Sequence, residues 1–117
     1  MQTNYAKIID AKDAMFNLAQ EHLPAKQAID LARLIKKLEA EIALFDEQRL
    51  KICREYGTLT DDGQDFQIDD DKRAAFSQAI NDLLALDVTI DGDPVHVTVE
   101  TISASTVIKT DGFVEFD

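Results

Sequence analysis

Apolar side chains recur at helical spacing along residues 3–22. Ile8, Ala11, Met15 and Leu18 follow one another at steps of three and four residues, which is the spacing of one face of an amphipathic helix. Pro24 comes next, and proline is tolerated in the first turn of a helix because its missing N–H would have no intrahelical partner there. The pattern predicts a helix over 3–22 and a second helix that begins near Pro24.

The alternation of three- and four-residue steps then continues without a slip to the end of the second predicted helix. Its positions are Ala28, Leu31, Ile35, Leu38, Ile42, Phe45, Arg49, Ile52 and Tyr56. Such a run predicts one long helix with a coiled-coil-like seam, roughly 45–50 Å in length at about 1.5 Å per residue. We expect this helix to form an antiparallel hairpin with the shorter helix before it.

The shorter helix cannot cover the whole seam. Leu34, Leu44 and Leu50 lie off the main stripe and give the long helix a second apolar flank that one partner helix would leave exposed. Either the C-terminal half folds back onto this surface, or a second copy of the chain covers it, for example in a homodimer. Arg49 is the polar residue of the seam. It can specify a partner, or its aliphatic stem can pack on apolar surface while its guanidinium reaches water or Asp46. If a second copy binds, the expected self-association residues are Leu34, Leu38, Leu44, Phe45 and Arg49.

Turn signals and short β-prone runs fill the second half of the chain. Gly57 is suited to the left-handed cap of the long helix. Asp62-Gly63 separates the runs 58–60 and 66–68, which predicts a β-hairpin. The aspartates at 69–71 precede a third amphipathic helix within 72–86, where carboxylates cap free N–H groups and oppose the positive end of the helix dipole.

Residues 88–100 alternate apolar and polar side chains around a turn at 91–94, which predicts a second hairpin. The tail predicts a short capped turn at Ser103 and a last strand near Phe113. The expected fold class is therefore α+β: an N-terminal antiparallel helical hairpin with one long coiled-coil-like helix, then a small β-hairpin/helix/β-hairpin unit. A chain of 117 residues fits one domain, 1–117, with a single core.

The net charge of −11 belongs to the second half of the chain. Residues 1–56 hold nine acids and nine bases, whereas residues 57–117 hold fourteen acids and three bases, Lys72, Arg73 and Lys109. An acidic surface repels nucleic-acid phosphate, so we expect no direct nucleic-acid binding. A basic protein is the natural electrostatic partner, although the charge can also serve solubility alone. The sequence has no run of eighteen apolar residues and does not start with a basic leader, so we expect neither a membrane span nor export.

Motifs for catalysis or for a cofactor do not stand out. The aspartates lack the alternate spacing, the glycine and the final glutamate of a calcium-binding loop, and the glycines form no phosphate-binding loop. His22 and His96 have no cysteine, histidine or paired carboxylate at ligand spacing. Cys53 cannot form an intrachain disulfide and is expected to be a small buried hydrophobic residue. We therefore expect no enzyme activity, no cofactor and no metal.

The order of these elements resembles a group of small proteins of unknown function that tailed phages and prophages encode. The likeness covers nearly the whole chain and rests on the run LPAKQAIDLARLIKKLEAEIALFDEQRLKICREYG, the acidic DDG turn, and the segments LLALDVTI, TISAS and FVEFD. The chain departs from the group in the tail, where the β-branched TVIKT stands in place of a longer helix-forming segment. The group has no assigned activity, so the resemblance implies only a setting, the cytoplasm of an infected bacterium or a virion.

Two hypotheses follow. In the first, the chain is an intracellular interaction protein whose acidic half binds a basic host or phage protein, in its sharpest form as a DNA-mimicking inhibitor of a nucleic-acid-binding complex. The expected contact residues are Asp61, Asp62, Asp65, Asp69, Asp70 and Asp71. In the second, the chain is an assembly or virion component that associates with itself through the long helix.

Overall fold

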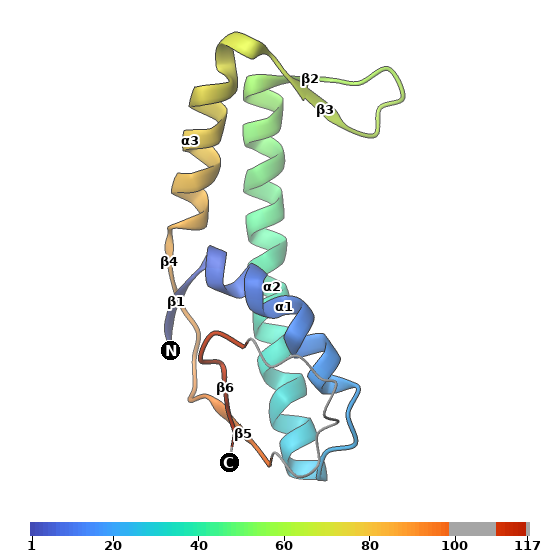
Figure 1. Cartoon of the computed structure of the whole chain (residues 1–117), viewed down its shortest axis with the longest axis vertical. Helices are drawn as coiled ribbons and strands as arrows, with labels where there is room; N and C mark the ends of the chain where they lie inside the picture. Colours follow the sequence, from blue (N-terminus) through green and yellow to red (C-terminus); the bar gives the residue numbers. More distant parts are fainter. Residues whose placement is uncertain (99–109, 117) are drawn as a thin grey trace.

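The fold is a mixture of helices and short strands in a computed structural model that describes residues 1–98 and 110–116 (Figure 1). The predicted α+β class and the pairing of the first two helices are confirmed. The predicted turn at Ser103 lies outside the described residues. The elements are β1 (Gln2–Asn4), α1 (Tyr5–Ala19), α2 (Ala25–Tyr56), β2 (Gly57–Leu59), β3 (Phe66–Ile68), the 3-10 turn η1 (Asp70–Lys72), α3 (Arg73–Leu84), β4 (Asp87–Thr89), β5 (Val95–Val97) and β6 (Val114–Phe116).

The first helix begins two residues later than its hydrophobic pattern predicts. Thr3 belongs to β1, and the Asn4 side chain caps α1 by accepting a hydrogen bond from the Lys7 amide at 2.9 Å. A side-chain acceptor at this position satisfies one of the amides that have no partner within the helix. The predicted stripe is buried from there on, with Ile8 and Met15 almost fully shielded from solvent.

The long helix is covered by different partners along its length. In Figure 1, α1 crosses the half of α2 that begins at Ala25, and α3 lies beside the half that ends at Tyr56. The hydrophobic core lies in the first of these halves, where α1, α2 and the strands β4, β5 and β6 meet. Its buried members are Ile8, Ala11, Met15, Leu18, Leu23, Leu31, Leu34, Ile35, Leu38, Val88, Ile90, Val95, Val97, Phe113 and Val114.

The other half of the molecule is thinner. Phe45, Cys53 and Leu83 are its buried apolar side chains among the described residues, and Tyr56 meets Phe76 edge to face with ring centroids 6.4 Å apart. The molecule is elongated, with principal extents of 52 × 29 × 20 Å. The end that carries β2 and β3 therefore stands well away from the main core.

The second predicted hairpin is wrong. β4 pairs antiparallel with β1, and β5 pairs in parallel with β6, so the two runs on either side of the 91–94 turn do not pair with each other. Residues 91–94 instead turn the chain from one two-stranded sheet to another, and the Val95 amide donates to the Phe113 carbonyl at 3.0 Å. The expected last strand near Phe113 is confirmed as β6.

The junction between α2 and the first hairpin differs from the predicted left-handed cap. Gly57 is extended, with φ −133° and ψ 177°. Its lack of a side chain matters because a Cβ there would lie 2.8 Å from Ile68 Cδ1, 2.9 Å from the Gln67 carbonyl oxygen and 3.0 Å from the Cys53 carbonyl oxygen. Glycine allows β3 to pass close to the last turn of the helix.

None of the helices within residues 1–98 and 110–116 has the length and apolar character needed to cross a membrane.

Candidate interaction surface

The hairpin formed by β2 and β3 projects sideways from the region where α2 ends and α3 begins (Figure 1). Its antiparallel register places Gly57 opposite Ile68 and Leu59 opposite Phe66. Residues directly opposite each other in such a pair share one face of the sheet. One face of the hairpin is therefore apolar, and this confirms the hairpin that the sequence predicts at 58–68.

The hairpin loop is held by side chains that bond to nearby backbone. Asp62 Oδ1 accepts hydrogen bonds from the Thr60 hydroxyl and from the Gln64 amide. These two bonds lower the pKa of Asp62 below its usual value, the bond from the Thr60 hydroxyl more than the bond from the Gln64 amide. Both favour the ionised carboxylate. Gly63 closes the turn with φ +70° and donates its amide to the Thr60 carbonyl at 2.9 Å.

Three other aspartates also have local partners. Asp65 Oδ1 accepts from the Phe66 amide at 2.8 Å. Asp69 lies 3.7 Å from Lys72 Nζ, and Asp70 lies 3.1 Å from Arg73 Nε. The predicted capping role is wrong for Asp69, whose side chain makes no capping hydrogen bond to η1. Its carboxylate faces a lysine three residues further on instead.

Asp61 and Asp71 differ from the other four. Both are exposed, and neither forms a hydrogen bond or ion pair with the described part of the chain. The ion pairs of Asp69 and Asp70 are exposed as well, and pairs of that kind contribute little in water. Residues 57–71 therefore present six carboxylates and no basic side chain.

The structure places the six aspartates in two groups rather than in one cluster. Asp61, Asp62 and Asp65 belong to the hairpin loop, whereas Asp69–Asp71 lie where the chain enters α3. The strand β3 separates the groups, and four residues of extended chain span about 13 Å. The negative charge forms a strip with an acidic group at each end of β3.

Sequence reasoning missed an apolar surface between the two acidic groups. A hollow of about 670 Å³ lies where the hairpin meets the end of α2, and Leu50, Arg54, Leu59 and Phe66 are among its lining residues. A second hollow of about 430 Å³, lined by Phe66, Ile68, Arg73 and Phe76 among others, lies toward α3. The predicted hairpin register could have shown that Leu59 and Phe66 share a face. It could not have shown that the helices leave this face partly uncovered.

The residues predicted for self-association divide into two sets. Leu34, Leu38 and Phe45 are buried within the single chain, with Leu34 and Leu38 in its core. Leu44 and Arg49 are exposed, and Arg49 Nε lies 3.7 Å from Asp46 Oδ1. The C-terminal half of the chain covers the seam together with α1, which was one of the two expected alternatives.

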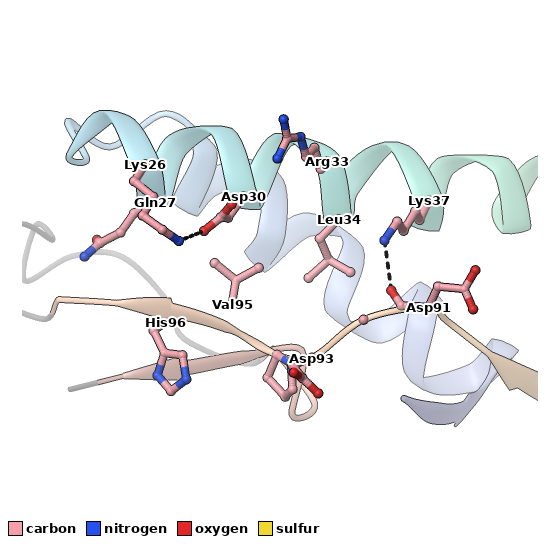
Figure 2. A pocket seen from close by; sticks show the side chains of 12 residues that line it. Lys26, Gln27, Asp30, Arg33, Leu34, Lys37, Asp91, Asp93, Val95 and His96 are labelled. Atoms are coloured by element: carbon pink, nitrogen blue, oxygen red, sulfur yellow. Dashed lines mark hydrogen bonds and ion pairs between the residues drawn. The ribbon is translucent and has the colours of Figure 1, made fainter.

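A separate groove of about 460 Å³ lies between α2 and residues 91–96 (Figure 2). Its charged side chains are three bases, Lys26, Arg33 and Lys37, and three aspartates, Asp30, Asp91 and Asp93, with His96 beside them.

The bases in this groove already interact with groups of the same chain, and Arg33, like Lys26, acts on Asp30. Lys26 pairs with Asp30 at 2.7 Å, and Lys37 donates to the Asp91 carbonyl at 2.9 Å. The Lys26 hydrogen bond is the main cause of the lowered pKa of Asp30. Gln27 also bonds to Thr98 through both its amide oxygen and its amide nitrogen. The groove is thus a contact that ties residues 91–98 to α2.

The other residues considered for chemistry are also accounted for by structure. Cys53 is buried in α2, as predicted. His96 and Glu115 are opposite each other in the β5–β6 pair, with Nε2 and Oε2 3.4 Å apart. Among residues 1–98 and 110–116, no three His, Cys, Asp or Glu side chains are grouped so that they could hold a metal ion.

Comparisons with protein-family models, with curated proteins and with solved structures found no match for this chain. The resemblance to the phage-encoded group stays a prediction.

Proposed function

We propose that the chain is a non-enzymatic protein-interaction module whose hairpin end binds a basic surface on another protein. One observation carries this proposal: residues 57–71 expose six carboxylates at an end of the molecule that stands away from its core, and four of the six form no ion pair with the described part of the chain, since Lys72 and Arg73 pair with Asp69 and Asp70. A surface charge of one sign accelerates encounter with a partner of the opposite sign.

Asp61 and Asp71 support the proposal most directly. The turn and the ion pairs account for the other four aspartates, but no contact within the described part of the chain explains these two. If the phage resemblance holds, the partner is a basic host or phage protein in the infected bacterium. A protein that binds nucleic acid fits this description, because a strip of carboxylates can compete with phosphate for its Lys and Arg side chains.

A double charge reversal, Asp61→Lys with Asp71→Lys, tests the proposal. We expect the variant to lose partners that the tagged wild-type protein captures from a bacterial lysate at low salt and releases at high salt. Asp13→Lys with Asp87→Lys is a matched control, because both residues are exposed and lie outside the hairpin end. The proposal is wrong if both double variants capture the same proteins in the same amounts, with circular dichroism showing that each is folded.

Self-association through α2, as in an assembly or virion component, is a second candidate function. The exposure of Leu44, a large apolar side chain of which 51% is accessible, favours it. The surface is narrow, however, because Leu44 and Arg49 are five residues apart and point about 140° apart around the helix axis. Sedimentation equilibrium of wild type and Leu44→Gln tests this candidate: a monomer at micromolar concentration in both cases would exclude it.

A further inference from the structure

The apolar face of the β2–β3 hairpin is incompletely covered by the rest of the chain. Ile68 lies against the last turn of α2, where its Cδ1 approaches Gly57 closely. Leu59 shares that face but is 52% exposed, and Phe66 is half-buried. Covering an exposed apolar side chain of this size with another apolar group is favourable, because it removes apolar surface from water.

The two hollows under this face share Phe66. Their volumes of about 670 and 430 Å³ fall within the range of roughly 300–1,000 Å³ that is typical of ligand-binding clefts. Their apolar lining comes from the hairpin and from both helices: Leu59 and Phe66 from the strands, Leu50 from α2 and Phe76 from α3. A side chain inserted in the first hollow would contact the hairpin and α2, and one inserted in the second would contact the hairpin and α3. Interface anchors fill pockets of this kind.

Charge decides what kind of group can approach these hollows. The charged side chains in the walls of the hollows are Arg54 in the first and Arg73, already paired with Asp70, in the second. The aspartates flank the hollows and outnumber these bases, with Asp61, Asp62 and Asp65 at one end of β3 and Asp69, Asp70 and Asp71 at the other. An apolar anchor would therefore have to arrive with basic neighbours. A second copy of this chain is disfavoured because it carries a net charge of −11.

We propose that these hollows bind a basic amphipathic helix of a partner protein, with a Leu or Phe side chain inserted beside Leu59 and Phe66 and with Lys or Arg side chains facing the two acidic groups. This inference rests on the proposed function, since it specifies the partner of the same acidic surface. It adds that apolar contact, and not charge alone, determines which basic proteins bind.

Three labelled peptides of about fifteen residues, long enough to form a helix, provide the test by fluorescence anisotropy. The first has Leu and Phe on one helical face and Lys and Arg on the other. The second keeps every charge but replaces Leu and Phe with Ser, and the third replaces Lys and Arg with Glu. We expect the first to bind the full chain, the second to bind at least roughly tenfold more weakly, and the third not to bind.

Leu59→Ser is the matching change on the protein. It should weaken binding of the first peptide roughly tenfold or more, and Leu59→Met, which keeps the apolar surface, should restore it. Leu86→Ser is the control, because Leu86 is also 52% exposed but follows the C-terminal end of α3, whereas the hairpin precedes its N-terminal end. An equal effect of Leu59→Ser and Leu86→Ser would overturn the inference.

The outcomes separate this inference from the function on which it rests. If the first and second peptides bind equally, and the double reversal of Asp61 and Asp71 abolishes both, the charge-driven function stands and the apolar anchor is wrong. If neither basic peptide binds and the double reversal leaves lysate capture unchanged, the proposed function fails and this inference fails with it.

Discussion

Gly57→Ala tests the close approach of β3 to the end of α2. The φ of −133° is open to any residue, so the cost is steric. The new Cβ would lie 2.8–3.0 Å from three atoms, two of which are backbone carbonyl oxygens of Gln67 and Cys53 that cannot rotate away. Overpacking of this kind costs about 1–3 kcal/mol. Reduced freedom of the unfolded chain offsets about 0.4–1 kcal/mol of it.

The net loss should be roughly 1–2 kcal/mol, which corresponds to a fall in Tm of roughly 4–8 °C in a domain of this size. Thermal unfolding followed by circular dichroism measures it, and amide hydrogen exchange of the hairpin shows whether the strands have separated from α2. Adding Ile68→Val should recover part of the loss, because it removes the Cδ1 atom but neither oxygen. A Tm within 1 °C of wild type, roughly a quarter of the shift expected per kcal/mol, together with unchanged hairpin exchange would refute the steric argument.

Three further predictions concern the core half of the molecule. Leu38 is 3% exposed, so Leu38→Ala should lower the free energy of unfolding in urea by about 2–5 kcal/mol. Leu44 is 51% exposed, so Leu44→Ala should change it by less than about 0.5 kcal/mol. Equal losses would contradict the burial of the seam within one chain. Burial, and then the 2.9 Å hydrogen bond to Glu41, raise the pKa of Tyr5 above 10.0. The Tyr5 phenol therefore contributes stability below pH 10 that is lost as pH rises through its pKa in the folded state. Tyr5→Phe should remove this contribution to the fall in unfolding free energy above pH 10. An unchanged pH profile of unfolding would contradict the assignment. Thr3→Val should stabilise the chain by about 1 kcal/mol in urea, since the buried Thr3 hydroxyl has no hydrogen-bond partner in the described part of the chain, and a loss would show that the hydroxyl is satisfied.

The helices could be predicted because each is marked by its own residues. The stripe at Ile8, Ala11, Met15 and Leu18 is the buried face of α1, and the run that follows Pro24 forms a single helix up to Tyr56. The hairpin at 57–68 was also predictable, because Asp62-Gly63 is a local signal that does not depend on distant parts of the chain.

The pairing of the other strands could not be predicted in this way. The alternation in 88–97 suits a strand but does not identify its neighbour. β1 pairs with β4, which lies more than eighty residues further along the chain, and β5 pairs with β6, which follows it by nineteen residues in register. Residues 2–4 are too few to show a period of two, so the strand that displaced the predicted hairpin gave no signal of its own.

The candidate surface was partly predictable. The sequence shows six aspartates, and turn hydrogen bonds or local ion pairs account for four of them. Whether the apolar side of the hairpin is covered depends on the angle at which β2 leaves α2, and the close packing at Gly57 sets that angle. Leu59 therefore looks like an ordinary strand residue until the helices are in place.

The pairing of β1 with β4 has a consequence for how the chain folds. Gln2 is opposite Thr89, so the first strand is made long before its partner. At synthesis rates of about 5–20 residues per second, β1 would wait roughly 4–17 seconds for β4, while α1 and α2 can already pack together. Closing so long a loop carries an entropic cost that only the finished core offsets. The α1–α2 pair should therefore be an early intermediate, and the N-terminal strand should be among the last segments to dock.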